Sequence, residues 1–298
     1  MNLIALILAL VMERLATQWL HLREPHWFDG YFEWTLRRFA KLRGVRVVVV
    51  ALVFTVLPVL PVAAVAIVFS EWLSGLAYVG FAAIVLVLSF GPRDLKAETD
   101  DYCAALGRGD THAAARAARA IMEHDARQRR HAAPNTVEDA IFVQANNRMF
   151  GAAFWFLAAG PAGAWLFRVS DLMRRHAMMQ HRDLFEHEAR GVDFVHALQA
   201  THGVLAWLPA RLLAIGYALA GSFDDAFASW RALVRNRLTG FFERNDELLM
   251  HVGRGALGAL GAPRAGYERC RAAMRLVWHA SLIWLVVAAL LVLIGRIV

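Results

Sequence analysis

The sequence has few cysteines and lacks several familiar catalytic motifs. Cys103 and Cys270 are the only cysteines in 298 residues, with no CxxC pair and no zinc-finger spacing. This argues against a disulfide framework or a structural zinc site. Neither a GxxxxGK[ST] loop nor a GxSxG elbow occurs, so the common phosphate-loop and hydrolase chemistries lack their parts. Strand-type alternation is also missing, and the predicted fold class is all-α.

Lysine is scarce too. The chain has 32 basic and 25 acidic side chains, and Lys41 and Lys96 are the only lysines among the basic ones. The net charge of +7 is therefore almost wholly arginine. A hydrophobic content of 58% and a mean hydropathy of +0.42 are too high for an ordinary soluble domain. The basic surplus then indicates membrane orientation and anionic lipid rather than nucleic acid. Membrane lipid is the expected partner, with other membrane proteins as candidate partners and no nucleic acid.

Long apolar runs are what the sequence does have. Residues 276–294 contain no Asp, Glu, Lys or Arg, and a helix of that length matches the hydrocarbon core of a bilayer. The same criterion predicts spans at 47–69 and 76–90. Shorter helices are expected around 3–20, 139–167 and 204–220, and whether they cross is left open. The prediction is one helical integral membrane domain over 1–298, with a polar insert at 93–136.

Local signals predict where these helices bend and which side they face. Pro58 and Pro61 should kink the second span, and Gly160-Pro161 should break the apolar stretch around it. Basic stretches at 21–46 and 93–140 predict amphipathic helices on the cytoplasmic side. Asp110 or Thr111 is the expected N-cap of an alanine-rich helix. The glycine-rich segment 253–261 has no lysine for phosphate, and we expect it to allow close helix packing.

Histidine is plentiful, at twelve residues, but its spacing does not favour a metal site. No two histidines stand four apart, which is the spacing that places two imidazoles on one helix face. We therefore predict scattered histidines and no metal ion.

Polar residues inside apolar helices are expensive in lipid and so mark candidate sites. Such residues interrupt the stretch 139–167 and the stretch 204–220, and another asparagine follows later in the chain. They predict either a ligand-binding cavity or a buried hydrogen-bond network between helices, and both alternatives stay open. The candidate ligand-binding residues are Glu138, Asn146, Asn147, Arg148, Arg211 and Asn245.

Four blocks in order resemble a known superfamily of membrane proteins. The superfamily contains the cobalamin-biosynthesis proteins CobD and CbiB and the β-lactamase-regulation protein AmpE. The blocks are ALGRGDTHAAARAARAI (105–121), VEDAIFVQANNRMFGAAFWFLAAGPAGAWLFR (137–168), AWLPARLLAIGYALAG (206–221) and GRGALGALGAP (253–263). The early ERL at 13–15 looks like the AmpE branch.

Departures from the enzyme pattern favour that branch. RVSDLM at 168–173 replaces an NTLD-type segment, and His202-Gly203 stands where the enzymes have an acidic pair. Chemistry with Mg²⁺ and phosphates needs such carboxylates. The resemblance therefore implies an AmpE-like regulatory or signalling protein of the bacterial inner membrane, linked to β-lactam response or cell-wall stress, without assigned catalytic residues or cofactor. The alternative is a CobD/CbiB-type adenosylcobinamide-phosphate synthase using ATP and Mg²⁺, with Asp139, Asp171 and Asp225 as substitute ligands.

Overall fold

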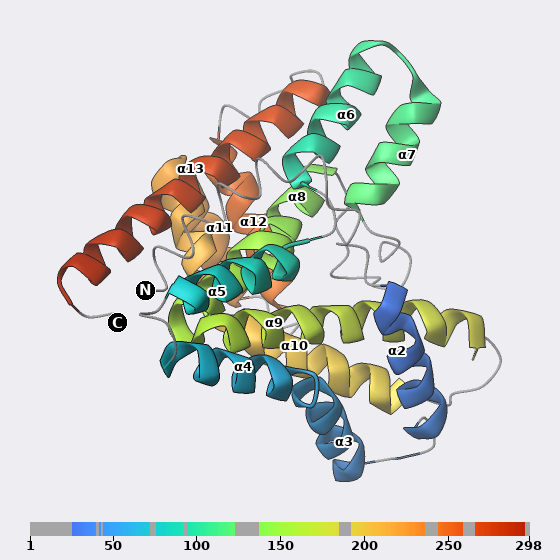
Figure 1. Cartoon of the computed structure of the whole chain (residues 1–298). Helices are drawn as coiled ribbons and strands as arrows, with labels where there is room; N and C mark the ends of the chain where they lie inside the picture. The colour runs from blue at the N-terminus through green and yellow to red at the C-terminus, as the bar shows by residue number, and fades with distance from the viewer. Residues whose placement is uncertain are drawn as a thin grey trace. The chain divides into compact units, whose positions relative to one another are not determined.

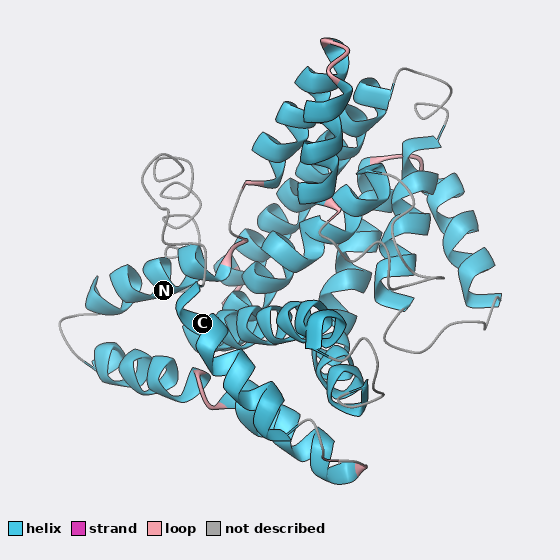
Figure 2. Cartoon of the chain, turned by 90° about the vertical axis from the view of Figure 1, so that its right-hand side faces the viewer, coloured by secondary structure: helices cyan, strands magenta, loops and turns pink. Residues whose placement is uncertain are grey.

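The computed structural model (Figure 1) describes residues 26–39, 42, 44–71, 76–91, 94–122, 137–184, 192–235, 244–258 and 266–295. All regular elements in these ranges are helices (Figure 2), so the all-α prediction is confirmed. The helix expected at 3–20 lies outside the described residues.

The chain divides into two compact units, and each is assembled from separated segments. The first unit comprises Met1–Pro92, Gly151–Leu205 and the last two residues, and the second comprises Arg93–Phe150 and Ala206–Arg296. Two compact units do not exclude one membrane domain, so the domain over 1–298 stays a prediction.

The first unit is built around one long helix, α9 (Gly151–Leu184). Four shorter helices pack against α9, and α4 runs beside it in Figure 1. The first part of α10 (Val192–Ala220) completes the unit. Its buried core includes Val47, Met173 and Leu198. The four shorter helices are α2 (His26–Phe39), α3 (Val45–Val56), α4 (Val59–Glu71) and α5 (Leu76–Ser89).

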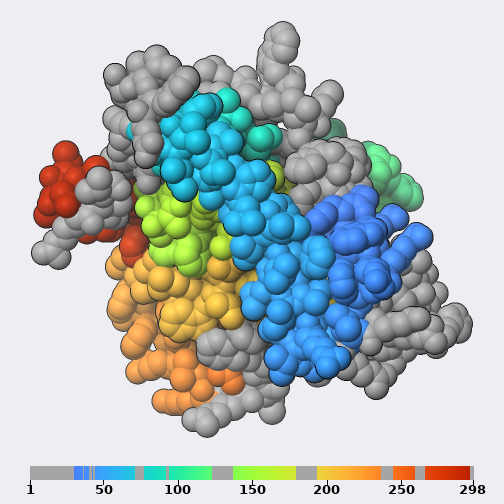
Figure 3. Space-filling model, turned by 60° about the horizontal axis from the view of Figure 1, so that its bottom comes forward, coloured from blue at the N-terminus to red at the C-terminus, as the bar shows by residue number. Residues whose placement is uncertain are grey.

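The kink predicted at Pro58 and Pro61 is confirmed at Pro58, which lies in the break between α3 and α4, whereas Pro61 lies inside α4. Proline lacks an N–H and its ring displaces the preceding turn, which leaves backbone carbonyls without helical partners. The indole Nε1 of Trp165, on α9, donates to the carbonyl oxygen of Pro58 at 3.1 Å. Apolar side chains on α3 and α4, including Val53 and Ile67, are exposed, and Figure 3 shows these helices at the surface in blue. This surface is suited to contact with lipid tails.

The predicted break at Gly160-Pro161 is confirmed inside α9. Ala159 has φ −136° and ψ 16°, and Gly160 has φ 67°, a left-handed value that a side chain would strain. The chain resumes a helix at once, because proline is tolerated in the first turn of a new helical segment.

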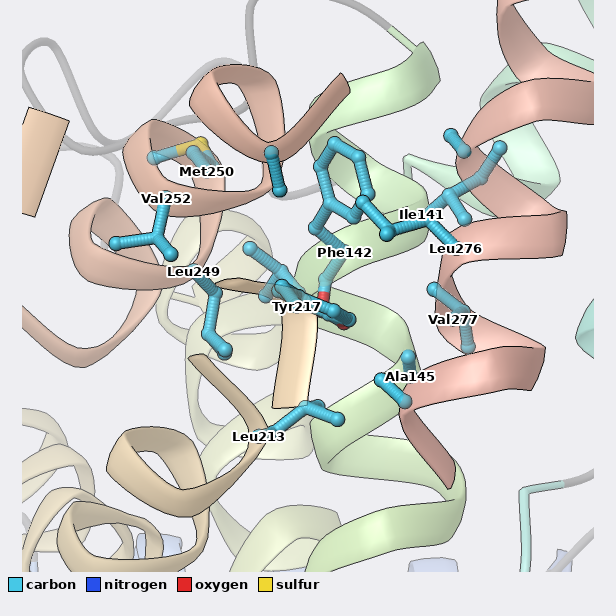
Figure 4. Packing of buried hydrophobic residues seen from close by; sticks show 14 of the residues in the cluster. Ile141, Phe142, Ala145, Leu213, Tyr217, Leu249, Met250, Val252, Leu276 and Val277 are labelled. Atoms are coloured by element: carbon cyan, nitrogen blue, oxygen red, sulfur yellow. The ribbon is translucent and has the colours of Figure 1, made fainter. Parts of the chain in front are cut away.

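The second unit packs the remaining helices around α8 (Val137–Ala145) and the end of α10. The rings of Phe142 and Tyr217 are 5.2 Å apart at the centre of the core (Figure 4), and the Tyr217 hydroxyl donates to the Phe142 carbonyl at 3.0 Å. The other elements are α6 (Leu95–Gly107), α7 (Thr111–Ile121), the π-helical turn η4 (Asn146–Phe150), α11 (Phe223–Arg235), α12 (Arg244–Leu257) and α13 (Gly266–Leu293). Asp110 is the N-cap of α7, since its carboxylate accepts from the N–H of Ala113 at 2.9 Å.

Four helical segments are long and apolar enough to cross a membrane: Val45–Ser70, Val137–Met178, Asp193–Ala220 and Gly266–Leu293. The stretches predicted as spans at 47–69 and 276–294 correspond to the first and the last of these segments. The protein is therefore a helical membrane protein.

The other predicted helices differ in length from the structure. The stretches 139–167 and 204–220 were expected to be short, but they belong to two of the four long segments. The span predicted at 76–90 is the 14-residue helix α5. At about 21 Å it is shorter than the hydrocarbon core of a bilayer, which is about 30 Å thick and needs roughly 20 helical residues. It ends before Gly91-Pro92, which cannot continue a helix.

The predicted close packing of the glycine-rich segment is confirmed at α12. A Cβ on Gly255 would lie 2.6 Å from the carbonyl oxygen of Asp225 and 2.9 Å from the Cα of Ala226, both on α11. Because backbone atoms block the position, Gly255→Ala should destabilise the protein by about 1–3 kcal/mol. The measurement is thermal unfolding in detergent. Gly107→Ala is the control, since nothing lies within 4 Å of its Cβ position, and equal stability of the two variants would contradict the packing.

Candidate functional site

A π-helical turn, η4, carries three of the predicted site residues. Asn146, Asn147 and Arg148 are consecutive in this turn and no more than 5% exposed. A π turn is wider than an α turn, and such turns inside α-helices occur frequently at functional sites. The turn therefore gathers amide and guanidinium groups in the interior of the second unit.

Arg148 joins this turn to the polar helices α6 and α7. Its Nη1 donates to Glu98 Oε2 at 2.7 Å, and its Nε donates to Gln144 Oε1 at 3.1 Å. Its Nη2 donates to the carbonyl oxygen of Ala120 at 3.2 Å. Glu98 was not predicted as a site residue, because 93–136 was interpreted as a polar insert. The ion pair shows that this insert supplies a buried carboxylate.

The two asparagines of the turn leave one polar atom unsatisfied. Asn146 Nδ2 donates to Asn147 Oδ1 at 3.2 Å. Asn146 Oδ1 is buried and has no hydrogen-bond partner among the described residues. A buried acceptor without a donor costs about 1–3 kcal/mol. This oxygen is thus suited to accept from a ligand.

Two further carboxylates of α8 are paired with arginines of the neighbouring helices. Glu138 Oε2 lies 2.7 Å from Arg269 Nη2 on α13. Asp139 Oδ1 lies 2.7 Å from Arg254 Nε on α12. Glu138, one of the predicted ligand-binding residues, thus joins α8 to α13.

Arg211 and Asn245, both predicted, are brought together between α10 and α12. Arg211 Nη1 donates to Asn245 Oδ1 at 3.0 Å and to the carbonyl oxygen of Trp207 at 2.8 Å. The guanidinium carbon also lies 4.1 Å from the centroid of the Trp207 ring. The six predicted residues therefore all lie in the second unit, in four sets of contacts: the Asn146–Asn147 pair and the separate contacts of Arg148, Arg211 and Glu138.

A charged cluster in the first unit was missed as a site by the sequence analysis. Asp171 of α9 is fully buried, and its carboxylate lies 3.4 Å from Arg168, 2.8 Å from Arg174 and 2.7 Å from Arg175. Asp171 had been considered only as a substitute Mg²⁺ ligand. The sequence spacing could have indicated this cluster, because arginines three residues before Asp171 and three and four residues after it share one helix face with Asp171.

His202 and Ser170 adjoin Asp171 but do not form an activated nucleophile. Ser170 Oγ lies 3.0 Å from His202 Nδ1, and His202 Nε2 lies 3.9 Å from Asp171 Oδ1. The serine hydroxyl already donates to the carbonyl oxygen of Phe167 at 2.7 Å. Its oxygen must then accept from the imidazole, so the histidine is not placed to remove the serine proton.

The carboxylates described here do not fit a divalent cation. Among the described residues, no group of three or more His, Cys, Asp or Glu side chains is close enough together to hold a metal ion. Glu98, Glu138 and Asp139 each face a guanidinium instead of one another. Mg²⁺ requires several oxygen ligands that converge on one point.

The two cysteines are not placed to act as reactive thiols. Both are free and buried. Burial raises the pKa of the Cys103 thiol, and Arg271 offsets this only in part. The thiol therefore stays protonated at neutral pH, and its sulfur contacts the carbonyl oxygen of Tyr267 at 3.4 Å.

Comparison with known proteins gives the family. A family model described as "Regulatory signalling modulator protein AmpE" matches residues 1–298. The chain belongs to the AmpE family. This AmpE-family chain is also 28% identical over 238 residues to a cobalamin biosynthesis protein CobD of Stutzerimonas stutzeri, covering 72% of this chain and 74% of that protein. A CobD of Chromobacterium violaceum is 30% identical over 176 residues, 58% of this chain and 53% of the relative.

No solved structure matches the AmpE-family chain. The family model and the two relatives confirm the resemblance that the four sequence blocks predicted.

Proposed function

We propose that this AmpE-family protein is a regulatory protein of the bacterial inner membrane, which binds a ligand and is not a synthase. The observation that carries the proposal is the pairing of carboxylates with arginines around α8. Glu98, Glu138 and Asp139 each lie 2.7 Å from a guanidinium. A carboxylate in such a pair is neutralised and oriented by the arginine, so it is not free to hold Mg²⁺ against phosphates.

Sensing needs a ligand site and an element that responds to it. The buried amide oxygen of Asn146 supplies an acceptor for a ligand. Arg148 of the same turn connects directly to α6 and α7, outside the four candidate spans. A ligand that hydrogen-bonds in the turn would therefore act on these two helices through Arg148. A membrane protein partner that contacts α6 or α7 would complete a signalling path.

The second candidate is a CobD-type enzyme, which the two curated relatives favour. Such an enzyme would join an aminopropanol unit to a corrinoid with ATP and Mg²⁺. The two proposals make opposite predictions for a strain that lacks the gene.

A clean deletion separates the candidates. We expect the deletion to alter β-lactamase induction by a β-lactam and to leave corrinoid-dependent growth unchanged. Complementation with the wild-type gene should restore induction, and the Asn146→Leu gene, which lacks the proposed ligand acceptor, should not. The control is Arg235→Gln, because Arg235 is exposed at the end of α11. Loss of corrinoid-dependent growth, with normal induction, would support the enzyme instead.

The purified protein provides a direct test of the enzyme. Detergent-solubilised protein is incubated with ATP, Mg²⁺, aminopropanol phosphate and adenosylcobyric acid, and products are followed by mass. We expect no ATP-dependent product. Turnover that disappears in Glu138→Gln would overturn the proposed function.

A further inference from the structure

Arg211 is a cation inside a candidate span, and the groups it contacts among the described residues are uncharged. It lies within Asp193–Ala220 and bonds the carbonyl oxygen of Trp207 and the amide oxygen of Asn245. Its guanidinium also lies over the indole ring of Trp207. The arginines around α8 differ, because Arg148, Arg254 and Arg269 each contact a carboxylate. None of the contacts of Arg211 within the described residues neutralises its charge.

A second arginine lies at the start of α12. Arg244 begins this helix directly before Asn245, the residue that Arg211 bonds, so it adds positive charge near Arg211. Two such groups are stabilised together when an anion lies between or beside them. The partial positive charge at the start of a helix adds to the same attraction. Asp246 and Glu247 follow on this turn, and within the described part of the chain neither forms an ion pair or hydrogen bond with Arg211.

Asn245 holds the arginine in place. It is only 2% exposed, and its amide oxygen accepts from Arg211 at 3.0 Å. One side of the guanidinium is therefore fixed by Asn245 and Trp207. Because a guanidinium carries five N–H donors in a planar fork, the fixed group can still donate to a further acceptor.

The surface next to this arginine is apolar. Trp207, Leu208 and Ile215 on α10 are 36–42% exposed within a segment suited to cross the membrane. A charged side chain beside lipid is costly unless it meets an anion or water. The anionic group most available at a membrane is phosphate, and arginine binds phosphate through paired N–H donors.

We propose that Arg211, held by Asn245 and assisted by Arg244, binds a phosphate group carried by a lipid headgroup or by a soluble phosphate ester. The proposal goes beyond the regulatory function proposed above, because it assigns phosphate as the chemical class that binds at Arg211, apart from the Asn146 turn. The two sources share one recognition chemistry, and a binding experiment with two arms distinguishes them.

The experiment measures thermal stabilisation of the full-length protein in detergent. In the lipid arm, phosphatidylglycerol is compared with digalactosyldiacylglycerol, which lacks phosphate. In the soluble arm, inorganic phosphate and glycerol phosphate are compared with chloride at matched ionic strength. We expect one phosphate arm to stabilise the wild type in a saturable way. Arg211→Gln should weaken that binding by about 10- to 100-fold, the usual effect of losing a hydrogen bond to a charged group.

Two matched variants keep the test decisive. Arg211→Lys retains the charge and should retain part of the binding, whereas exposed Arg235→Gln should bind like the wild type. Circular dichroism and size exclusion check that each variant is folded. If Arg211→Gln does not fold, the folded Arg211→Lys and an Arg244→Gln variant are compared, and each should bind more weakly than the wild type. The absence of phosphate-specific stabilisation in both arms, or equal binding in all variants, would overturn the proposal.

The outcomes also separate this proposal from the regulatory function. If the deletion alters β-lactamase induction but no phosphate arm stabilises the protein, the phosphate site alone is wrong. If phosphate binds through Arg211 but the deletion abolishes corrinoid-dependent growth, the regulatory function alone is wrong.

Discussion

Asp171→Asn is expected to destabilise the protein by about 3–5 kcal/mol, the cost of breaking a buried ion pair from one side. The carboxylate is fully buried and lies within 3.4 Å of Arg168, Arg174 and Arg175. Asparagine keeps the size of the side chain but removes its negative charge. The three guanidiniums would then repel one another in the interior of the first unit. The measurement is thermal unfolding in detergent, followed by size exclusion.

Asp193→Asn is the matched control for this substitution. Asp193 is exposed in the first turn of α10, in the same unit, and the change should cost less than about 1 kcal/mol. If Asp171→Asn is as stable as Asp193→Asn, the arginine cluster does not depend on Asp171.

The second large effect is expected at the pair of Glu98 and Arg148. Arg148→Met should also cost about 3–5 kcal/mol, because it leaves Glu98, whose side chain is 10% exposed, as a buried charge without this partner. The double variant Glu98→Gln/Arg148→Met should be more stable than Arg148→Met alone, since no unpaired charge remains. Thermal unfolding of the two single variants, the double variant and the wild type gives the coupling energy of the pair.

An exposed pair on the same helix serves as the control. Lys96 Nζ lies 2.8 Å from Asp100 Oδ2, with 63% and 54% of the two side chains exposed. Solvent screens such a pair, and Lys96→Met should change stability by less than about 1 kcal/mol. A double variant at Glu98 and Arg148 that is no more stable than Arg148→Met would show that desolvation of Glu98 is not the cause of the loss.

The membrane helices and their interruptions could be predicted from the sequence because the signals are local. The uncharged run 276–294 lies in α13 except for its last residue, and Pro58 separates α3 from α4. Gly160 takes the left-handed conformation that a break before proline suggested. The N-cap at Asp110 depends on an N–H only three residues away. Each feature follows from length, backbone restriction or a short hydrogen bond.

The candidate site was predictable only in part, because its members are paired by tertiary contacts. The cost of polar groups in lipid identified Arg148 and Arg211, but it did not identify their partners. Glu98 is 50 residues from Arg148, and Asn245 is 34 residues from Arg211. Glu98 lies in a polar stretch, so its sequence context indicates exposure to solvent, and only the packing of α6 buries it.

The sequence alone thus determined that this is an all-α membrane protein of the AmpE family, where its helices break and which polar residues deserve testing. Only the tertiary structure decided that the chain forms two interleaved units, that Asp171 gathers three arginines, and that the carboxylates of α8 face guanidiniums. The physical reason is the range of the interactions. Hydrophobic length and backbone restriction act within one helix, whereas the pairing of most buried charges depends on which helices come together.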